Sequence, residues 1–426
     1  MSAAAAGYSL WIVLGVLILG AILQLQQYLP DLPSDHPAIR YADRQVDDPV
    51  ARLSRERGND VSAHESGQQE AHREPGLGVL GTLLRRLDVA VDSQALAFAK
   101  TSFQANRVAP DNPRAIYFND DVAVAYVRGS DLIEIASVDP EIGPIFYTVD
   151  LGSLPETGFE RRQVCLECHL GPATSGVPGL FVGSVVPDPT GKPARAEAII
   201  TDHRTAFEDR WGGWYVNATR GQQRDRSNAV ASSPAQPLLL DEGGGRNLLH
   251  LYGKFDPARY LAPMSDIVAL MTFEHQTQML NYLTRVSWQE RIALHDDEWT
   301  EAERRGFDAD IEALVAYMVF EDEVPLPEPV EGVSSFTESF PRRGPHDSEG
   351  RSLRDFDLEH RLFRYPLSYM IYSRSFDALS DATREAIYRR LDRKLVGEQR
   401  VAILEILRET KPGLPDYFGT DLDPMK

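Results

Sequence analysis

The chain has 426 residues, 42% of them hydrophobic, so it is able to bury a substantial core and is long enough for roughly two to three domains. Its 64 acidic residues outnumber its 44 basic residues and give a formal net charge of −20. This balance argues against a nucleic-acid binder, because such affinity comes from lysine and arginine side chains that neutralise phosphates. A protein partner with a basic surface is compatible with it.

The N-terminal region predicts attachment to a membrane. No charged residue interrupts the 18 residues from Tyr8 to Leu25, about the minimum for a helix that crosses a bilayer. The preceding residues contain no lysine or arginine, and the following ones offer no small-residue cleavage site, which favours an anchor over a cleaved signal peptide. We therefore expect residues 1–25 to form a transmembrane helix.

Residues 26–75 predict a flexible linker. They are rich in Pro, Asp, Arg, Gln and Gly and contain few apolar side chains to offset the entropy of the chain. We expect a disordered tether in which His36, His64 and His72 are exposed to solvent and bind no metal.

The folded part is predicted to begin at Gly76 and to be of the α+β class. A helical pattern over residues 80–103 precedes short alternating runs that are typical of antiparallel strands. A central domain is assigned to residues 76–324 and a mainly helical C-terminal region to residues 325–426, after a proline-rich break. The expected strands lie at 114–120, 121–129, 132–139 and 144–150, with a further hairpin at 181–200 and a helix after Ser380, its expected N-cap.

Both cysteines of the chain lie within four positions, in the sequence Cys165-Leu166-Glu167-Cys168-His169. The C-x-x-C-H spacing places two thiols on one turn, where they form thioethers to the two vinyl groups of a haem, and places an imidazole beside them for the iron. The motif predicts one covalently attached haem c, with His169 as the proximal ligand. The rest of the central domain is then the haem-bearing domain.

Two other uses of the cysteines are weaker. A structural zinc site needs four ligands, yet the chain has no third cysteine and no H-x3-5-H pair. A dithiol oxidoreductase places C-x-x-C at the start of a helix in a βαβ context, and the histidine behind it has no special role there. These two alternatives stay open behind covalent haem.

The segment from Arg161 to Phe181 resembles the c-type cytochromes. In small cytochromes c, the motif is followed by a glycine-containing loop and a proline whose carbonyl helps to orient the proximal histidine, and "CHLGPATSGVPGLF" is similar, with Pro178 in that place. The chain departs from that family before the motif, where strands replace the usual helix, and after it, where no short distal loop carries methionine. The whole chain looks like large bacterial proteins with one cytochrome-c-like site.

The resemblance implies attachment of haem outside the cytoplasm, so the folded part is expected in the periplasm, anchored to the cytoplasmic membrane by a single span. The function it implies is electron transfer with a redox protein partner. Two alternatives stay open: a peroxidase-like haem enzyme, with Glu274 or His203 as its acid or base, and a haem-bearing sensor or assembly subunit. Whether the protein is an enzyme is therefore not decided by the sequence, and no catalytic residue is assigned.

The sixth iron position distinguishes a carrier from an enzyme. Residues 265–294 predict a long buried helix that begins near Ser265, and His275 lies in the middle of its apolar stripe, where iron would satisfy one ring nitrogen. A core histidine bonded to a carbonyl group is the alternative to this distal ligand. Met271 or Met279 and an open position follow as choices. Further candidates are His203, His250 and Met264.

The segment from Thr201 to Arg226 carries histidine, arginine and tryptophan close together. Arg204 is predicted to pair with a haem propionate, and Trp211 to wall the haem pocket. The alternative is that the aromatic side chains pack the core while the arginines remain solvated.

Overall fold

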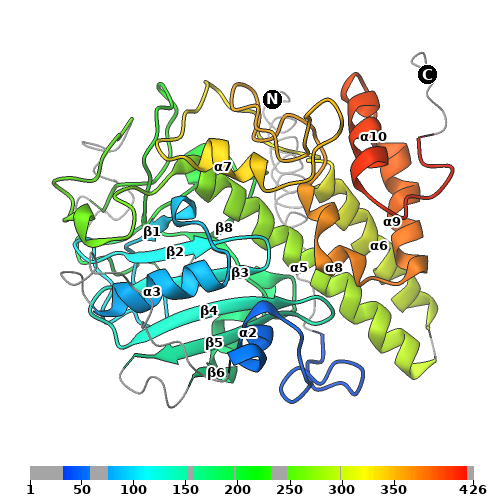
Figure 1. Cartoon of the computed structure of the whole chain (residues 1–426), viewed down its shortest axis with the longest axis horizontal. Coiled ribbons are helices and arrows are strands. Elements are labelled where there is room, and N and C mark those ends of the chain that lie inside the picture. Colours follow the sequence, from blue (N-terminus) through cyan, green and yellow to red (C-terminus); the bar gives the residue numbers. More distant parts are fainter. Residues whose placement is uncertain are drawn as a thin grey trace, which may run out of the picture.

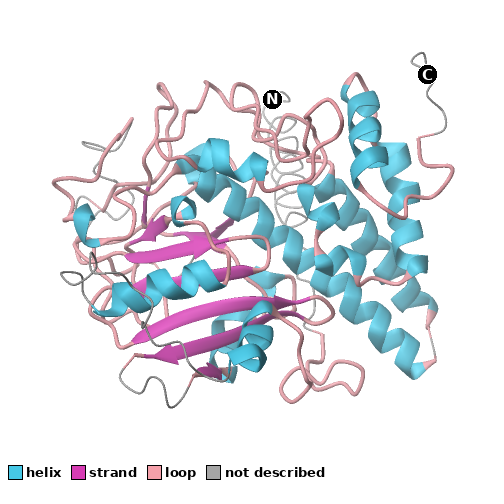
Figure 2. Ribbon diagram, viewed as in Figure 1, coloured by secondary structure: helices cyan, strands magenta, loops and turns pink. Residues whose placement is uncertain are grey.

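The computed structural model describes residues 32–57, 75–151, 158–195, 198–231, 247–297 and 299–419. Its centre is an antiparallel sheet of seven strands in the order β6-β5-β4-β3-β2-β1-β9 (Figures 1 and 2). The strands are β1 (Ala95–Ala97), β2 (Arg114–Phe118), β3 (Val122–Val127), β4 (Leu132–Asp139), β5 (Gly143–Asp150), β6 (Phe159–Arg161) and β9 (Trp214–Tyr215).

Strands β2 to β5 form a meander, as their alternating pattern predicted. Asn119 closes the turn between β2 and β3, because its side-chain oxygen accepts from the backbone N–H groups of Asp121 (3.0 Å) and Val122 (2.8 Å). The helical pattern expected over residues 80–103 is only partly right. Its second half contributes β1, an inner strand of the sheet.

Helices cover the two faces of the sheet. On one face, α2 (Pro49–Arg57) and α3 (Pro75–Arg86) lie across the strands toward the viewer of Figure 1, and the side chains of α3 join Tyr117, Val124 and Ile135 in one core. The second core joins the opposite face to α5 (Ile267–Asp296). Phe118 of β2 meets Phe273 of α5 there, with ring centroids 4.7 Å apart. The sheet therefore lies between two helical layers, and the fold is of the α+β class.

Helix α5 is the predicted long buried helix, displaced by two residues at each end. Its N-cap is Asp266, whose side chain accepts from the backbone N–H groups of Val268 (2.8 Å) and Ala269 (3.3 Å). Ser265, the expected start signal, instead donates to the carbonyl of Tyr215 (2.7 Å). The first turns of α5 are thereby fixed to the last strand of the sheet.

The predicted C-terminal region contains four α-helices and no named strand among its described residues, but the helices hold fewer than half of these residues. It contains α7 (Phe336–Arg342), α8 (Arg374–Asp377), α9 (Asp381–Lys394) and α10 (Gln399–Thr410), which follow α6 (Glu301–Met318). Ser380 is the N-cap of α9 and accepts from the N–H of Thr383 at 3.2 Å. Lys394 of α9 pairs with Glu312 (3.0 Å) and Glu321 (2.6 Å) in and just after α6. The predicted hairpin is formed by β7 (Val182–Ser184) and β8 (Ile199–Thr201).

Residues 32–57 belong to the folded body, so the prediction of a disordered tether over residues 26–75 was wrong for this part. Ile39 and Tyr41 are buried, and the Tyr41 hydroxyl donates to the carbonyl of Pro144 at 2.6 Å. The composition predicted too few apolar side chains to offset the conformational entropy of this segment. A small number of them is enough when they pack on the sheet.

Two further contacts hold this segment. The backbone N–H of Leu32 donates to the carbonyl of Gly176 (2.9 Å), which lies in the loop after the cysteine motif. The buried carboxylate of Asp48 accepts from the Tyr147 hydroxyl (2.7 Å) and from the first turn of α2 at Val50 (2.9 Å). The N-terminal segment therefore contacts both the sheet and the region of the motif.

In the described part of the chain, no helix is at once long and apolar enough to cross a bilayer. This finding runs against the predicted transmembrane helix and the single-pass location in the cytoplasmic membrane, and the fold is corrected to α+β without an assigned membrane helix. Helix α5 has the length, with 30 residues, but buries polar and charged side chains such as Glu274 and Arg285. The predicted anchor at residues 1–25 and residues 58–74 of the linker lie outside the described residues.

Candidate haem-attachment site

The cysteine motif lies at the edge of the sheet. Strand β6 leads into a 3-10 turn (Gln163–Cys165) and then into the four-residue helix α4 (Leu166–His169). Both cysteines are free thiols; Cys165 is half-buried and Cys168 is exposed. The motif therefore presents two thiols and one imidazole on a single turn near the surface, where a macrocycle can reach them.

The imidazole of His169 is oriented by the backbone. Its Nδ1 lies 2.9 Å from the carbonyl oxygen of Gly179, and the N–H of Gly179 donates to the carbonyl of His169 at 2.9 Å. The ring lies between Phe146 of β5 and Phe181, with centroids 4.8 and 5.7 Å away. An Nδ1–H that donates to a carbonyl leaves the lone pair on Nε2, which is the nitrogen that a proximal ligand offers to iron.

Burial keeps this imidazole neutral. It lowers the pKa of His169 to about 4, and the positive charge of Arg114 lowers it further, although the bond to Gly179 acts in the opposite direction. Metals bind only the neutral form of histidine. The side chain is therefore in the protonation state that ligation requires over most of the pH range.

The loop after the motif is closed by short-range contacts. Leu170 and Pro178 form an isolated antiparallel bridge, and the Thr174 hydroxyl donates to the carbonyl of Val177 at 2.6 Å. The predicted role of Pro178 needs correction by one residue, because the carbonyl that faces the imidazole belongs to Gly179. Pro178 fixes the backbone direction just before that carbonyl.

Three polar side chains of α5 hold this loop from behind. The Asn281 amide donates to the carbonyl of Leu180 (2.8 Å) and accepts from its N–H (3.2 Å). Gln278 and Arg285 both contact Ser175, through its hydroxyl (3.3 Å) and its carbonyl (3.0 Å). The spacing of three and four residues puts these side chains on one face of the helix.

Sequence reasoning missed Asn281, Arg285 and Gly179. A Cβ at Gly179 would lie 2.1 Å from Asn281 Oδ1, so the loop and the helix approach each other more closely than a larger residue permits. The available signal was a pair of polar residues, Asn281 and Arg285, one helical turn apart in a segment that was predicted to be buried.

Small side chains lie on one face of the sheet beside the motif. Ala136 pairs with Phe146 and with Ala123 in the ladder, and Ala125 pairs with Glu134, so these residues share one face. Ala123 and Ala125 are half-buried. Large side chains stand on the same face, because Phe118 pairs with Ala123 and Phe146 with Ala136, and the two alanines of β3 pack against the core that includes α5.

Two charged side chains lie on the same face of the sheet. Arg114 of β2 and Glu134 of β4 lie 3.5 Å apart and are both largely buried. Burial raises the pKa of the Cys165 thiol to about 11, and the charge of Glu134 adds to the effect. Glu134 is therefore close to the first cysteine. Arg114, which the sequence did not single out, is the cation near His169 that is able to pair with a haem carboxylate.

The structural context does not favour the other uses of the cysteines. The motif follows an antiparallel edge strand and lies outside any βαβ unit, so the setting of a dithiol oxidoreductase is missing. Within the described ranges, the only group of three or more His, Cys, Asp or Glu side chains close enough to share a metal contains neither cysteine. A zinc site at the motif has no described partners.

His275 does not meet His169 in the structure. It is completely buried, and both of its ring nitrogens have protein partners: Nδ1 lies 3.1 Å from Nδ1 of His203, and Nε2 lies 2.8 Å from the hydroxyl of Ser368. Its ring stacks on Phe320, with centroids 4.4 Å apart. The expectation that iron satisfies one nitrogen of His275 is corrected by these contacts, and the core histidine is the better reading, with side chains in place of the expected carbonyl.

Arg204 and Trp211 also have other surroundings. Arg204 pairs with Asp202 (2.6 Å) and lies over the ring of Tyr317, 4.8 Å from its centroid. Trp211 is completely buried, with its ring centroid 5.8 Å from that of Phe207. No described contact joins either side chain to the cysteine motif, so the predicted propionate and wall roles find no support in this arrangement.

The remaining candidates for the sixth iron position are dispersed. Met271 and Met279 are buried in the core beside α5, Met264 is half-buried before it, and His250 is exposed beside Tyr252. The described side-chain contacts of His169 include none of them. The distal ligand is therefore not assigned by the geometry.

No family model, curated protein or solved structure matches the chain. The evidence for the site accordingly consists of the motif and the geometry around it.

Proposed function

We propose that Cys165, Cys168 and His169 bind one haem c and that the protein acts in electron transfer. The observation that supports this best is the 2.9 Å contact from His169 Nδ1 to the carbonyl of Gly179. It fixes the ring, and it leaves Nε2 available for iron.

When bound, haem supplies a one-electron iron couple. The chain contributes the two thiols for thioether bonds, a neutral imidazole, and the rings of Phe146 and Phe181, which keep water from that imidazole. The exposure of Cys168 places one attachment point at the surface, which suits exchange of electrons with a protein partner.

The enzyme alternative has less support. Glu274, one proposed acid or base, is completely buried, and His203, the other, is 3% exposed. Ser368, His275 and His203 do form a row with the spacing of a nucleophile, a base and an orienting group, but Ser368 and His275 are also completely buried. A substrate cannot reach these groups in this arrangement. The sensor alternative stays a prediction.

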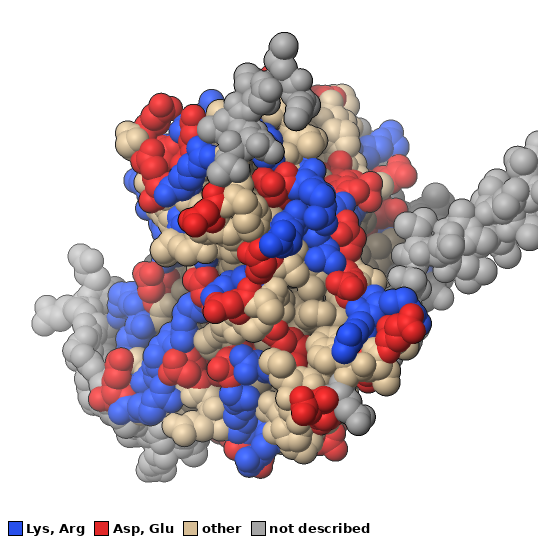
Figure 3. All heavy atoms as spheres, turned by 90° about the vertical axis from the view of Figure 1, so that its right-hand side faces the viewer, with Lys and Arg blue, Asp and Glu red and all other residues tan. Residues whose placement is uncertain are grey.

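The proposed partner is a redox protein, and the net charge of −20 favours one with a basic surface. Figure 3 shows that charges of both signs alternate over the face that carries the C-terminal helices. Arg390 of α9, for example, pairs there with Asp308 (2.9 Å) and Glu312 (3.3 Å). This mixed surface does not mark a docking patch of one sign, so the partner is expected on another face.

The proposal is tested on protein produced together with a c-type haem-maturation system. The parent should keep its colour in acidified organic solvent and should show the absorption spectrum of a pyridine haemochrome. The Cys165→Ala/Cys168→Ala variant should release all of its haem, whereas each single variant keeps one thioether and serves as the matched control. Covalent haem in the double variant would disprove attachment at this motif.

A second measurement separates a carrier from an enzyme. Carbon monoxide is added to the reduced parent, and the visible spectrum is recorded over time. A carrier with two protein ligands to iron should bind it slowly or not at all. Rapid binding together with peroxide turnover would contradict electron transfer as the function while leaving the attachment site intact.

A further inference from the structure

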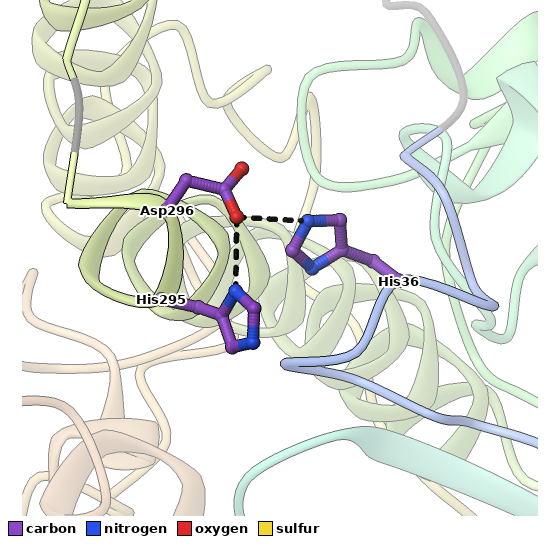
Figure 4. Close-up of side chains that lie close together, drawn as sticks. All are labelled: His36, His295 and Asp296. Atoms are coloured by element: carbon purple, nitrogen blue, oxygen red, sulfur yellow. Dashed lines mark hydrogen bonds and ion pairs between the residues drawn. The ribbon is translucent and has the colours of Figure 1, made fainter.

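Three metal-binding side chains meet on the side of the molecule where the N-terminal segment passes the end of α5. Nε2 of His36 lies 3.3 Å from Oδ1 of Asp296, and Nδ1 of His295 lies 2.9 Å from the same oxygen (Figure 4). The three possible ligand atoms all lie within 4.8 Å of one another. His36, which the sequence placed in a disordered tether as a solvated residue, is therefore part of a cluster, and its side chain is only 17% exposed.

The backbone holds this cluster from both sides. The carbonyl of His36 accepts from the N–H groups of Ile39 (2.8 Å) and Arg40 (2.9 Å), so the residue begins a tight turn that the buried Ile39 anchors. On the other side, His295 and Asp296 occupy the last turn of the 30-residue helix α5. The backbone therefore places two ligands in the last turn of α5, where each side chain is 47% exposed, and one ligand on an anchored turn.

A packing contact in the core also connects the two sides of the cluster. Tyr41, five residues after His36, packs against Trp288 of α5, two turns before His295, with ring centroids 6.1 Å apart. Both side chains are buried. Core packing therefore fixes how the two backbone segments that carry the ligands lie relative to each other.

We propose that His36, His295 and Asp296 bind a divalent ion of the zinc type. Two imidazoles and one carboxylate are ligands that such ions prefer, and three protein ligands leave a fourth position for water. Ligand atoms around a tetrahedral zinc ion lie about 3.3 Å apart, because each is about 2.0–2.1 Å from the metal. The nitrogen-to-oxygen distances of 3.3 and 2.9 Å are close to this value.

Binding changes the tautomer of one histidine. The N–H of Ala38 donates to Nδ1 of His36 at 3.2 Å, so the ring proton lies on Nε2 and faces Asp296 in the metal-free protein. An ion at Nε2 requires this proton to move to Nδ1, and the bond from Ala38 is then lost. A coordinate bond to zinc is much stronger than this loss.

The consequence is a metal clip between two parts of the fold. An ion that binds only when the turn at His36 is docked against α5 stabilises that docking by mass action. The clip does not depend on the proposed haem function. It joins the N-terminal segment, whose Leu32 contacts the loop after the cysteine motif, to the helix that holds the same loop.

The full-length protein, treated with a chelator and dialysed, is titrated with zinc chloride in a calorimeter. The parent should bind one ion with high affinity, and zinc should raise its melting temperature. His36→Ala, His295→Ala and Asp296→Asn should each weaken binding by at least about tenfold and abolish the rise in melting temperature. The matched control is His360→Ala, which removes an exposed histidine 3.5 Å from Asp357 and should behave as the parent does.

Circular dichroism of the zinc-free variants checks that each one folds. Equal zinc affinity in the parent and in a His36→Ala/His295→Ala variant would overturn the proposal, as would the absence of binding by the parent. Because the haem spectrum is recorded in the same samples, failure of the zinc site is distinguishable from failure of the haem site.

Discussion

His169 and Gly179, ten residues apart, face each other through two backbone-mediated contacts. The imidazole Nδ1 lies 2.9 Å from the Gly179 carbonyl oxygen, and the Gly179 N–H donates to the His169 carbonyl. The loop between them thus closes on the residue that it orients. Asn281 of α5 then fixes the next residue of the loop, so the orientation of the imidazole is tied to the buried helix at the centre of the fold.

Gly179→Ala should disturb this arrangement. A Cβ at Gly179 would lie 2.1 Å from Asn281 Oδ1 and 2.9 Å from the side chain of Thr174, so the loop must move away from α5. We expect a loss of about 1–3 kcal/mol in the free energy of unfolding, as for other overpacked sites, and a lower yield of covalent haem. Gly183→Ala is the control, because a Cβ there meets nothing closer than 3.6 Å. Equal stability of the two variants in urea would contradict the close approach.

Asn281→Ala should be more harmful than its small size suggests. The substitution leaves both the N–H and the carbonyl of Leu180 without their partner, and each unsatisfied group costs about 1–3 kcal/mol. Asn281→Asp keeps an acceptor for the N–H but loses the donor and buries a carboxylate, so it should also be less stable than the parent. Urea denaturation measures both losses, and no loss for Asn281→Ala would show that the amide does not hold the loop.

The cysteine motif is recognisable in the sequence because its spacing lies within five residues, and the haem attachment that it predicts stays a prediction. Alternation and helical periodicity of apolar residues report burial directly. These patterns therefore also predicted the strands from Arg114 to Asp150 and the helix after Ser265. Periodicity placed His275 correctly in the core. It gave no information about which residue would meet the imidazole.

That information is not local. Ser368 reaches His275 across 93 residues of sequence, and His203 reaches it from 72 residues before. The folded N-terminal segment was missed for the same reason, because composition counts apolar residues but does not show that Ile39 and Tyr41 find a preformed surface. Contacts of this kind follow from topology, which a single sequence does not supply.

His275→Ala should destabilise the protein without changing the spectrum of the proposed haem. The variant opens a cavity and leaves His203 and Ser368 without their shared partner, at a cost of about 2–5 kcal/mol. The low-temperature electron paramagnetic resonance spectrum of the oxidised protein, per bound haem, should be that of the parent. Conversion of a low-spin to a high-spin signal would instead identify His275 as an iron ligand and contradict its place in the core network.

Asp48→Ala should loosen the N-terminal segment. The carboxylate caps α2 at Val50 and accepts from the buried Tyr147 hydroxyl, so its removal costs about 2–4 kcal/mol. Limited proteolysis should then cut the segment faster than in the parent. Asp43→Ala is the matched control, because Asp43 forms an exposed pair with Arg40 and its removal should leave stability close to that of the parent. Equal cleavage of the parent and Asp48→Ala would show that this carboxylate does not hold the segment.

Glu274 should make stability depend on pH. Its carboxyl group is completely buried; Oε1 accepts from the Thr201 hydroxyl at 2.5 Å, and Oε2 lies 3.6 Å from the nearest nitrogen of Arg210. Burial raises the pKa of Glu274 from 4.5 to about 7, although Arg210 and Thr201 lower it and Asp202 raises it. Between these two pH values the folded protein binds a proton that the unfolded chain releases.

The sign of the effect follows from this difference. The contribution of Glu274 is fully present below pH 4.5, declines as the pH rises to about 7, and then stays constant; its total size is about 3 kcal/mol. The test measures unfolding in urea from pH 4 to 8 for the parent and for Glu274→Gln, which stays neutral. The buried histidines titrate alike in both proteins. The free energy of unfolding of the parent minus that of Glu274→Gln should therefore fall with rising pH. Glu301→Gln, at an exposed position, is the control for the loss of one carboxylate. A flat or rising difference for Glu274→Gln would mean that this carboxyl group is already ionised in the folded protein near pH 5.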